Sequence, residues 1–461
     1  MKNLLILITT FGFIFSGCRK IVFDEVTTTP IVDNTILEGK ISANRTLKTG
    51  VTYKLRGFVY VTNGATLTIE PGTKIVGELN KNGALIICRG AKIMADGTAT
   101  SPIIFTSEAA IPQRGDWAGV IILGKAPTNN SFNGIDGVGE IEGGINNAEG
   151  LGLYGDGLAS NPADNSGILR YVRIEYAGYA VLPDKEINGL TMGCVGNGTI
   201  IDYVQVSFAN DDSFEWFGGT VNCNHLISYR TLDDDFDTDN GFAGKVQFGI
   251  ALRDSAVADI SNSEAFESDN DANGSSFTPS TSAVFSNMTV LGPKSTLANI
   301  GNSKFLAGAQ IRRNSTMSLY NSIIAGWPKG LIIDASKGVP TDNNINGATP
   351  SLFVQGNIIA GSPQPVVYAA SSTAATGADN ASILAWYSTA AYSNTILANN
   401  TDVKLVAPFN YSSPDFNIAD AGSPAASGAL FTASKLTGFT QVAYKGACAI
   451  GDTWWRTWTK F

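Results

Sequence analysis

The segment "DYVQVSFANDDSFEWFGG" (202–219) is followed by "NHLISYRTLDDDFDTDNG" (224–241), and the two match when offset by about 21 or 22 residues. Three aligned pairs carry the match: Ser207 on Ser228, Phe214 on Phe236, and Glu215 on Asp237. A period slightly above twenty is about one turn of a parallel β-helix, in which equivalent positions of neighbouring coils stack about 4.8 Å apart. The repeat therefore predicts a solenoid of short parallel strands.

Shorter copies of the repeat lie on either side. "RYVRIEYAG" (170–178) parallels the start of the first segment, and "EAFESDN" (264–270) again places an acid, Glu267, directly after a phenylalanine, Phe266. We expect the phenylalanines to form a ladder inside the solenoid and the acids beside them to form an outward-facing column. Short strands with Gly and Asn corners are also compatible with a sandwich or a propeller, but the internal repetition favours the β-helix.

Composition agrees with an all-β fold and excludes one class of partner. The chain has 461 residues, 50 of them glycine, and few stretches with helical spacing of apolar residues. Its formal net charge is −9, and no stripe of Lys and Arg is apparent. Binding to nucleic acid needs such a basic surface, so we expect no nucleic-acid partner.

The solenoid is expected to span residues 46–440, after a tether and N-terminal cap at 18–45. The Gly- and Asn-rich stretch 125–167 is too polar for core and is predicted to be a surface loop insertion. Residues 441–461 are predicted to form a C-terminal cap over the last coil, because an open edge invites pairing with another chain. Their tryptophans, Trp454, Trp455 and Trp458, are alternatively a platform for stacking sugars.

The N-terminal "MKNLLILITTFGFIFSGC" (1–18) has one lysine and then an apolar run too short to span a bilayer. It resembles the lipobox of bacterial lipoproteins, which implies cleavage after residue 17 and acylation of Cys18. Arg19 after the cysteine favours, by the same resemblance, the outer membrane. Whether the protein faces the periplasm or the exterior stays open, and an ordinary secretory signal is the alternative.

The cysteines do not favour a zinc site. Cys194 and Cys223 are 29 residues apart, near one coil plus a loop, so they are candidates for a disulfide in an oxidising compartment. Small buried thiols inside the solenoid are the alternative. With one histidine and no CxxC spacing, a zinc site is not expected.

Acidic residues form two loops with the alternation that calcium sites use. "DFDTDNG" (235–241) and "DNDANGS" (269–275) each place an oxygen ligand at every second residue, although neither is an EF-hand. The stacked column would add ligands from adjacent coils. The predicted Ca²⁺ ligands are Asp235, Asp237, Asp239, Asp269, Asp271, Asn273, Glu215 and Glu267. The alternative is a solvated acidic edge whose Asp and Asn side chains satisfy turn backbones.

Several motifs together carry a resemblance to a known family. "LTIEPGTKIVGE", "RGDWAGVIILGKAP", "DDSFEWFGG", "ESDNDANGS" and the ending "YKGACAIGDTWWRTWTKF" are similar to those of secreted or lipid-anchored proteins common in Bacteroidetes. These proteins are right-handed parallel β-helices with a pectate-lyase-like fold. The resemblance covers the chain from about residue 40 to its end and implies fold and location, but no particular reaction.

Other parallel β-helices are enzymes, which defines the alternative function. Pectate lyases use calcium with an arginine base, and polygalacturonases use paired aspartates with a histidine; the candidates here are Asp211, Asp212 and His225, with Arg253, Arg312 and Arg313. Fold alone does not confer an activity. The preferred hypothesis is a non-enzymatic, outer-membrane-anchored β-helix, stabilised by calcium, that binds a glycan, a cell-surface polymer or an outer-membrane transporter. The alternative is a calcium-dependent polysaccharide lyase or glycoside hydrolase that uses the acidic column.

Overall fold

The computed structural model describes residues 35–461, except 183–184, 300, 347–348 and 372–375. The described residues from Thr35 to Phe461 form one compact unit. The predicted signal peptide and the lipidation site Cys18 lie outside the described residues. No helix in the described part of the chain is both long and apolar enough to cross a bilayer.

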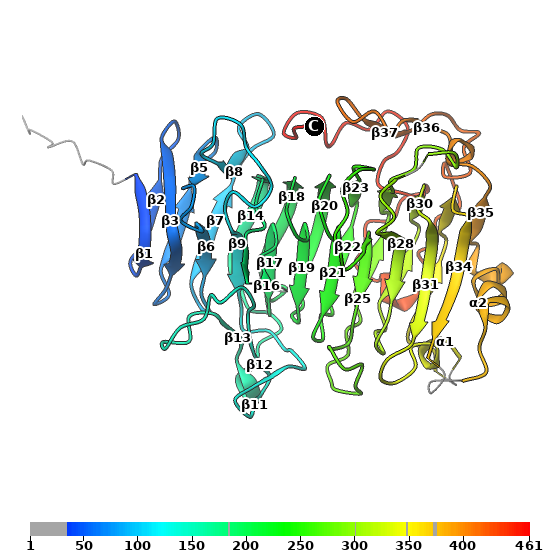
Figure 1. The fold of residues 1–461 in the computed structure, drawn as a ribbon, viewed down its shortest axis with the longest axis horizontal. Coiled ribbons are helices and arrows are strands. Elements are labelled where there is room, and N and C mark those ends of the chain that lie inside the picture. Colours follow the sequence, from blue (N-terminus) through cyan, green and yellow to red (C-terminus); the bar gives the residue numbers. More distant parts are fainter. Residues whose placement is uncertain (1–34, 183–184, 300, 347–348, 372–375) are drawn as a thin grey trace, which may run out of the picture. The chain divides into compact units, whose positions relative to one another are not determined.

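Twenty-nine short strands form one continuous sheet that winds into successive coils, and every pairing within it is parallel (Figure 1). This is the predicted right-handed parallel β-helix. The N-terminal coils contain β1 (Ile36–Ile41), β2 (Arg45–Leu47), β3 (Thr52–Val61), β4 (Thr66–Ile69), β5 (Lys74–Gly77), β6 (Ala84–Ile87), β7 (Lys92–Asp96), β8 (Ile103–Ser107) and β9 (Gly119–Leu123).

The central coils contain β14 (Gly167–Glu175), β17 (Leu190–Gly193), β18 (Ile200–Ser207), β19 (Phe214–Phe217), β20 (Asn222–Tyr229), β21 (Phe236–Asp239), β22 (Lys245–Gln247), β23 (Ile250–Leu252), β24 (Ser263–Glu264) and β25 (Phe266–Ser268). The C-terminal coils contain β26 (Val284–Ser286), β27 (Thr289–Leu291), β28 (Phe305–Ile311), β29 (Ser318–Tyr320), β30 (Ile323–Ala325), β31 (Lys329–Ala335), β32 (Val354–Gln355), β33 (Ile358–Ala360), β34 (Gln364–Ala370) and β35 (Thr395–Leu397).

The register of the central coils confirms the predicted stacking. Phe214 of β19 pairs with Phe236 of β21, which pairs with Phe266 of β25. The Phe236 ring lies 5.7 Å from the Phe214 ring and 5.4 Å from the Phe266 ring, all three fully buried. Aromatic rings stacked at this separation attract one another beyond their area burial. The phenylalanine ladder therefore lies inside the solenoid.

One detail of the predicted alignment is wrong. β18 and β20 pair with a uniform offset of 22, so Val206 lies opposite Ser228 and Ser207 opposite Tyr229. An offset of 21 would have moved every side chain to the other face of the strand, because side chains alternate with a period of two. The apolar residues of both strands that face the core fix the offset at 22.

The insertion at 125–167 leaves the coils and forms two small antiparallel hairpins, visible below the central coils in Figure 1. Their strands are β10 (Ser131–Phe132), β11 (Ile135–Asp136), β12 (Val138–Glu140) and β13 (Leu153–Gly155). A third hairpin joins β15 (Ala180–Leu182) and β16 (Lys185–Glu186). The insertion is not wholly surface loop, because Ile141, Ile145 and Tyr154 are buried against the coils.

The C-terminal segment does not cover the last coil, which corrects the predicted cap. It runs back along the side of the solenoid, where Trp458 lies 6.0 Å from the Tyr203 ring of β18 and Trp454 lies 4.9 Å from the His225 ring of β20 (Figure 1). Gln205 fixes its end by exchanging hydrogen bonds of 2.8 and 2.9 Å with the Lys460 backbone. The tryptophans take part in this packing, so they form no open platform on which sugars could stack.

Helix α2 (Asn380–Tyr387) packs on the last coil instead. It lies against β34, and its buried side chains Ile383 and Tyr387 join the same apolar cluster as the interior of the coils. The remaining α-helix of the described chain is the one-turn α1 (Asn343–Asn346). The remaining strands, β36 (Leu405–Ala407) and β37 (Asp415–Ile418), form an outer hairpin.

The predicted disulfide is absent. Cys194 and Cys223 are both free thiols, and they belong to different apolar clusters. Cys223 points into the solenoid from β20, whereas Cys194 follows β17 and packs outside it with Tyr154 of the insertion. Both are small buried apolar side chains, as the alternative interpretation held.

Candidate metal-binding cleft

An acidic cleft lies where the turns after β18 and β20 meet the starts of β19, β21 and β25. Its volume is about 450 Å³. Among the described residues that line it, Arg312 is the one cationic side chain and none is aromatic. Ten carboxylates line it: Glu142, Asp211, Asp212, Glu215, Asp233, Asp234, Asp237, Asp259, Glu264 and Glu267.

Backbone hydrogen bonds between coils hold three of these acids in a row. The Asp212 carboxylate accepts a 2.7 Å bond from the Asp234 backbone N–H, and the Asp234 carboxylate accepts a 2.6 Å bond from the Glu264 backbone N–H. Each acid thus satisfies the corner of the next coil, which is why the corner sequence repeats Asp or Glu at this position. The remaining carboxylate oxygens are left to face the cleft.

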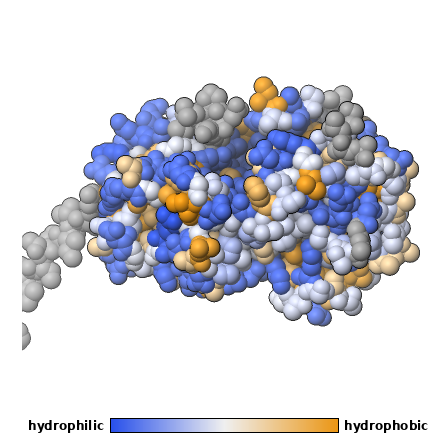
Figure 2. Space-filling view, turned by 90° about the horizontal axis from the view of Figure 1, so that it is seen from below, coloured by the Kyte–Doolittle hydropathy of each residue, from blue (hydrophilic) through white to orange (hydrophobic). Residues whose placement is uncertain are grey.

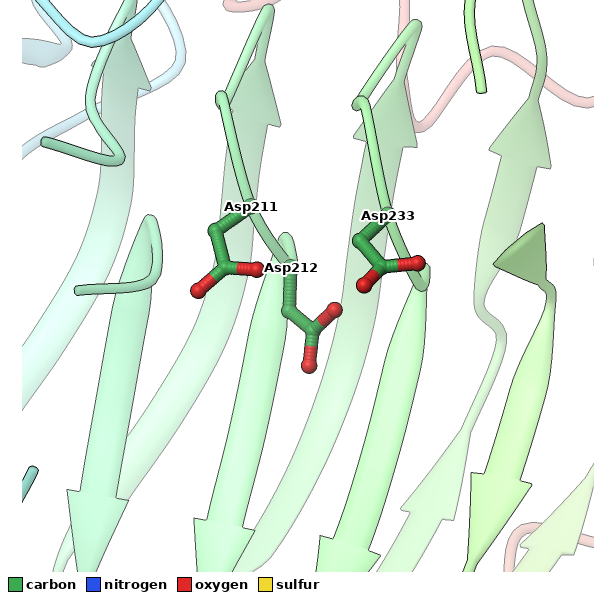
Figure 3. A group of neighbouring side chains, drawn as sticks. All are labelled: Asp211, Asp212 and Asp233. Carbon is green, nitrogen blue, oxygen red and sulfur yellow. The ribbon is translucent and has the colours of Figure 1, made fainter. Parts of the chain in front are cut away.

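The carboxylates meet in three groups, and within each group one oxygen per residue lies within 4.8 Å of the others. Figure 3 shows the first group, in which Asp211 and Asp212 from one corner point toward Asp233 of the next. The groups are Asp211, Asp212 and Asp233; Asp212, Glu215 and Asp237; and Asp234, Glu264 and Glu267. The first two share Asp212.

Burial and mutual repulsion raise the pKa values of several of these acids. For Asp212 and Asp237 burial is the larger cause, and a like charge adds to it, Asp211 for Asp212 and Glu267 for Asp237, so both pKa values lie well above the ordinary range. The pKa of Asp233 rises to about 7 and that of Glu264 to about 8. Charges of one sign this close repel strongly in a medium that excludes water, so the fully ionised cleft needs a counterion.

Arginine neutralises one end of the cleft. Arg312 forms ion pairs with Glu267 and with Asp269, the latter at 2.8 Å, and Arg313 also pairs with Asp269. Burial alone would lower the pKa of Arg312, but Glu267 and Asp269 raise it above its ordinary value. The other end, around Asp212 and Asp237, has no such partner among the described residues.

The column Glu215, Asp237 and Glu267 is in register as predicted, and all three acids line the cleft. Asp237 has a carboxylate oxygen whose hydrogen-bonding capacity is not satisfied. Its Oδ1 atom is buried and has no hydrogen-bond partner. A carboxylate oxygen in this state costs free energy unless a cation or proton satisfies it.

The other predicted ligands do not join this group. Asp235 turns inward to a buried ion pair with Arg253, and Asp239 lies outside the cleft, accepting a hydrogen bond from the Asn240 backbone. Asp271 also lies outside the cleft, and its carboxylate accepts bonds from the Asn273 and Ser275 backbones of its own turn. Asp235 follows a tight corner, where the period-two alternation that predicted its direction does not apply.

His225 is not part of the cleft. Its Nδ1 atom lies 2.8 Å from Asp202 Oδ1, and its ring is stacked between Tyr203 and Phe248, 4.2 and 5.2 Å away. The C-terminal Trp454 covers it. The predicted pairing of this histidine with Asp211 and Asp212 is therefore wrong, although both aspartates do line the cleft.

Sequence reasoning missed five cleft acids. Asp233 and Asp234 could have been found, because they follow Asp211 and Asp212 by the same offset of 22 that aligns the phenylalanines. Glu264 could have been found from its place two residues before Phe266. Glu142 and Asp259 come from loops outside the repeat, and no spacing marks them.

The fold and its row of acids define a right-handed parallel β-helix protein with an acid-lined cleft on its coils. Residues 39–396 match the family described as the pectate-lyase like beta helix domain, and the chain belongs to that family. No curated protein matches the chain closely enough to name a relative.

Proposed function

We propose that the cleft binds divalent cations, Ca²⁺ in particular, and that the protein uses them to bind a glycan without cleaving it. The observation that carries the proposal is the convergence of three carboxylate groups whose oxygens lie within 4.8 Å of one another. Two oxygens that each lie about 2.4 Å from one Ca²⁺ are at most about 4.8 Å apart. The oxygens within each group therefore meet this condition for sharing a single ion.

The donor set favours a hard cation. Among the described lining residues there is no histidine or cysteine, and carboxylate, amide and hydroxyl oxygens are the ligands that Ca²⁺ takes. Asp237 Oδ1, buried without a partner, is the atom that most needs the ion. When bound, the ion would supply positive charge that holds these carboxylates ionised and free coordination positions for an outside oxygen.

The ligand that suits such a site carries hydroxyl or carboxylate oxygens. None of the described residues that line the cleft offers an aromatic ring on which a sugar could stack, so recognition through bound cations would replace stacking. Figure 2 shows one face of the protein as largely hydrophilic, with apolar residues in small separate patches. A polar, oxygen-rich polymer fits this surface better than an apolar protein partner does.

Arg312 supports binding rather than lyase chemistry. A base must release its proton before it can take one from the substrate. Two carboxylates hold the Arg312 guanidinium and raise its pKa, so it stays protonated. The other arginine candidates are also paired with carboxylates, Arg253 with Asp235 and Arg313 with Asp269. His225 packs under the C-terminal segment away from the cleft.

A glycoside hydrolase is the second candidate, and one observation favours it. Glycosidases pair a protonated carboxyl with an ionised carboxylate. Asp233 and Glu264, with pKa values of about 7 and 8, retain protons near neutral pH. An assay for new reducing ends with acidic and neutral polysaccharides tests this candidate, and unsaturated products would indicate a lyase.

We also propose that acylated Cys18 anchors the protein to the outer membrane. Support comes from "FSGC" (15–18) at the end of a short apolar run, with Arg19 after it. The bound polymer would then lie at the cell envelope, and an outer-membrane transporter is a further partner consistent with that location.

Isothermal titration with Ca²⁺ tests the proposal through Asp212, the acid shared by two groups. We expect the wild-type protein to bind Ca²⁺ and Asp212→Asn to bind it at least about tenfold more weakly, a loss of about 1.4 kcal/mol. The matched control Asp136→Asn, on the exposed hairpin of the insertion, leaves the affinity unchanged. If wild-type and Asp212→Asn proteins give the same titration, the cleft is not the cation site. Glycan-array binding with and without EDTA then tests the ligand class.

A further inference from the structure

Beneath the cleft lies a buried ion pair that the proposed cation site does not itself use. Arg253, directly after β23, and Asp235, directly before β21, are both completely buried, and their nearest N and O atoms are 3.3 Å apart. Ser228 donates a hydrogen bond to Asp235 and lies 2.7 Å from Ser213 Oγ. Two serines, the aspartate and the arginine thus form one internal polar network.

The network reaches the cleft through the backbone. Arg253 donates one hydrogen bond to the Leu232 carbonyl at 2.9 Å and another to the Asp233 carbonyl. Leu232, Asp233 and the next residue, Asp234, all line the cleft. The guanidinium therefore holds the corner from which two cleft acids project, one in the first carboxylate group and one in the third.

This pair is poorly explained as a stabilising device. Asp235 Oδ2 and Arg253 Nε are buried and have no hydrogen-bond partner. An ion pair stripped of water and left partly unsatisfied is often no better for stability than apolar residues of the same volume. The two groups do, however, fix a corner whose geometry an apolar pair could not hold.

We propose that Arg253, held by Asp235, is a positioning residue for the cation site, presetting the Asp233–Asp234 corner for the metal. This inference rests on the proposed function. Residues that hold metal ligands in place affect affinity strongly although they do not touch the ion, and removing one typically weakens binding about 10- to 100-fold.

The test compares the double variant Arg253→Met/Asp235→Asn with Arg253→Lys. The double variant removes both charges together, so no uncompensated charge stays buried and the coils fold. We expect its Ca²⁺ affinity, measured by calorimetry on the full chain, to fall about tenfold or more. Arg253→Lys keeps the charge but cannot donate to the Leu232 and Asp233 carbonyls with two arms of one guanidinium, so it should weaken binding as well.

A control removes a partly exposed arginine–aspartate pair elsewhere. Arg170 and Asp96 form a two-bond pair, at 2.7 Å for each bond, on coils away from the cleft. Arg170→Met/Asp96→Asn should bind Ca²⁺ as the wild type does. If the Arg253→Met/Asp235→Asn variant keeps wild-type affinity, the positioning role is overturned and the cation site stands. If the wild-type protein binds no Ca²⁺, both proposals fail together.

Discussion

Asp212 belongs to two carboxylate groups and also caps the next coil, so one side chain links the fold to the site. Its neighbours are acids held at short range and shielded from water by burial. Their raised pKa values mean that the metal-free protein keeps protons here at a pH where exposed carboxylates are ionised. Proton and cation are therefore alternative ways of balancing the same charges.

This competition predicts an unusual dependence of stability on pH. Acids whose pKa is higher in the folded state stabilise it below their unfolded pKa of roughly 4, and that stability is lost as the pH rises through the folded values. Asp233 and Glu267 have pKa values of about 7 and Glu264 of about 8. In EDTA, we expect the melting temperature to fall between pH 5 and pH 8.

Calcium should remove most of that fall, since a bound cation favours the ionised form. At a free Ca²⁺ concentration 100 times its Kd, the stabilisation is about 2.7 kcal/mol. Thermal melts at pH 5 and pH 8, with EDTA or Ca²⁺, check both statements. A melting temperature that rises with pH in EDTA, or that Ca²⁺ leaves unchanged at pH 8, would contradict these two predictions.

At the scale of the elements, the phenylalanine ladder aligns the coils that carry the acids. Each step of the ladder pairs an interior ring with a cleft acid on the next residue, as in Phe236 and Asp237. Because successive side chains of a strand point to opposite faces, the acid that follows an inward-facing ring points outward. The same register that fills the core thus builds the acidic column.

The variant Phe236→Ala measures what the ladder contributes. Truncating a buried phenylalanine typically costs about 3 to 5 kcal/mol, because contacts are lost and a cavity is left. The ring lies between two others and is fully buried, so we expect a cost in that range by denaturant unfolding. Phe277→Ala, at a side chain 63% exposed, is the control and should change stability little. Equal effects of the two substitutions would show that the ladder is not a stabilising element.

How far sequence predicts such elements depends on whether they repeat. The offset of 22 places Phe214 over Phe236 and Glu215 over Asp237, and it is readable because equivalent residues meet the same neighbours in each coil. Asp235 was misplaced, since a corner breaks the alternation of a strand. Glu142 and the C-terminal Trp454 reach their positions through contacts between distant parts of the chain, and no local pattern encodes those.

At the scale of the whole chain, a family fold carries a cleft whose acids would be costly without a cation. Membership in the pectate-lyase like beta helix domain family accounts for the coils over 39–396. It does not account for the function, because binding and cleavage both occur on this fold. The distinction lies in groups such as Arg312, which two acids hold protonated.

The proposed lipid anchor gives a prediction about the intact precursor. Acylation needs the Cys18 thiol, so Cys18→Ala should abolish labelling with palmitate in the host cell. The variant should also leave the membrane fraction, since the acyl group on Cys18 is the proposed attachment to the bilayer. Cys88→Ala, which removes a buried thiol, is the control and should stay labelled and membrane-bound. Labelled Cys18→Ala protein would contradict the anchor.

The most direct test of the central claim is a long-wavelength anomalous diffraction map of crystals grown with Ca²⁺. We expect an anomalous peak in the cleft, about 2.4 Å from oxygens of Asp212, Glu215 and Asp237. A map with no peak among the cleft carboxylates, at a Ca²⁺ concentration far above physiological levels, would contradict it.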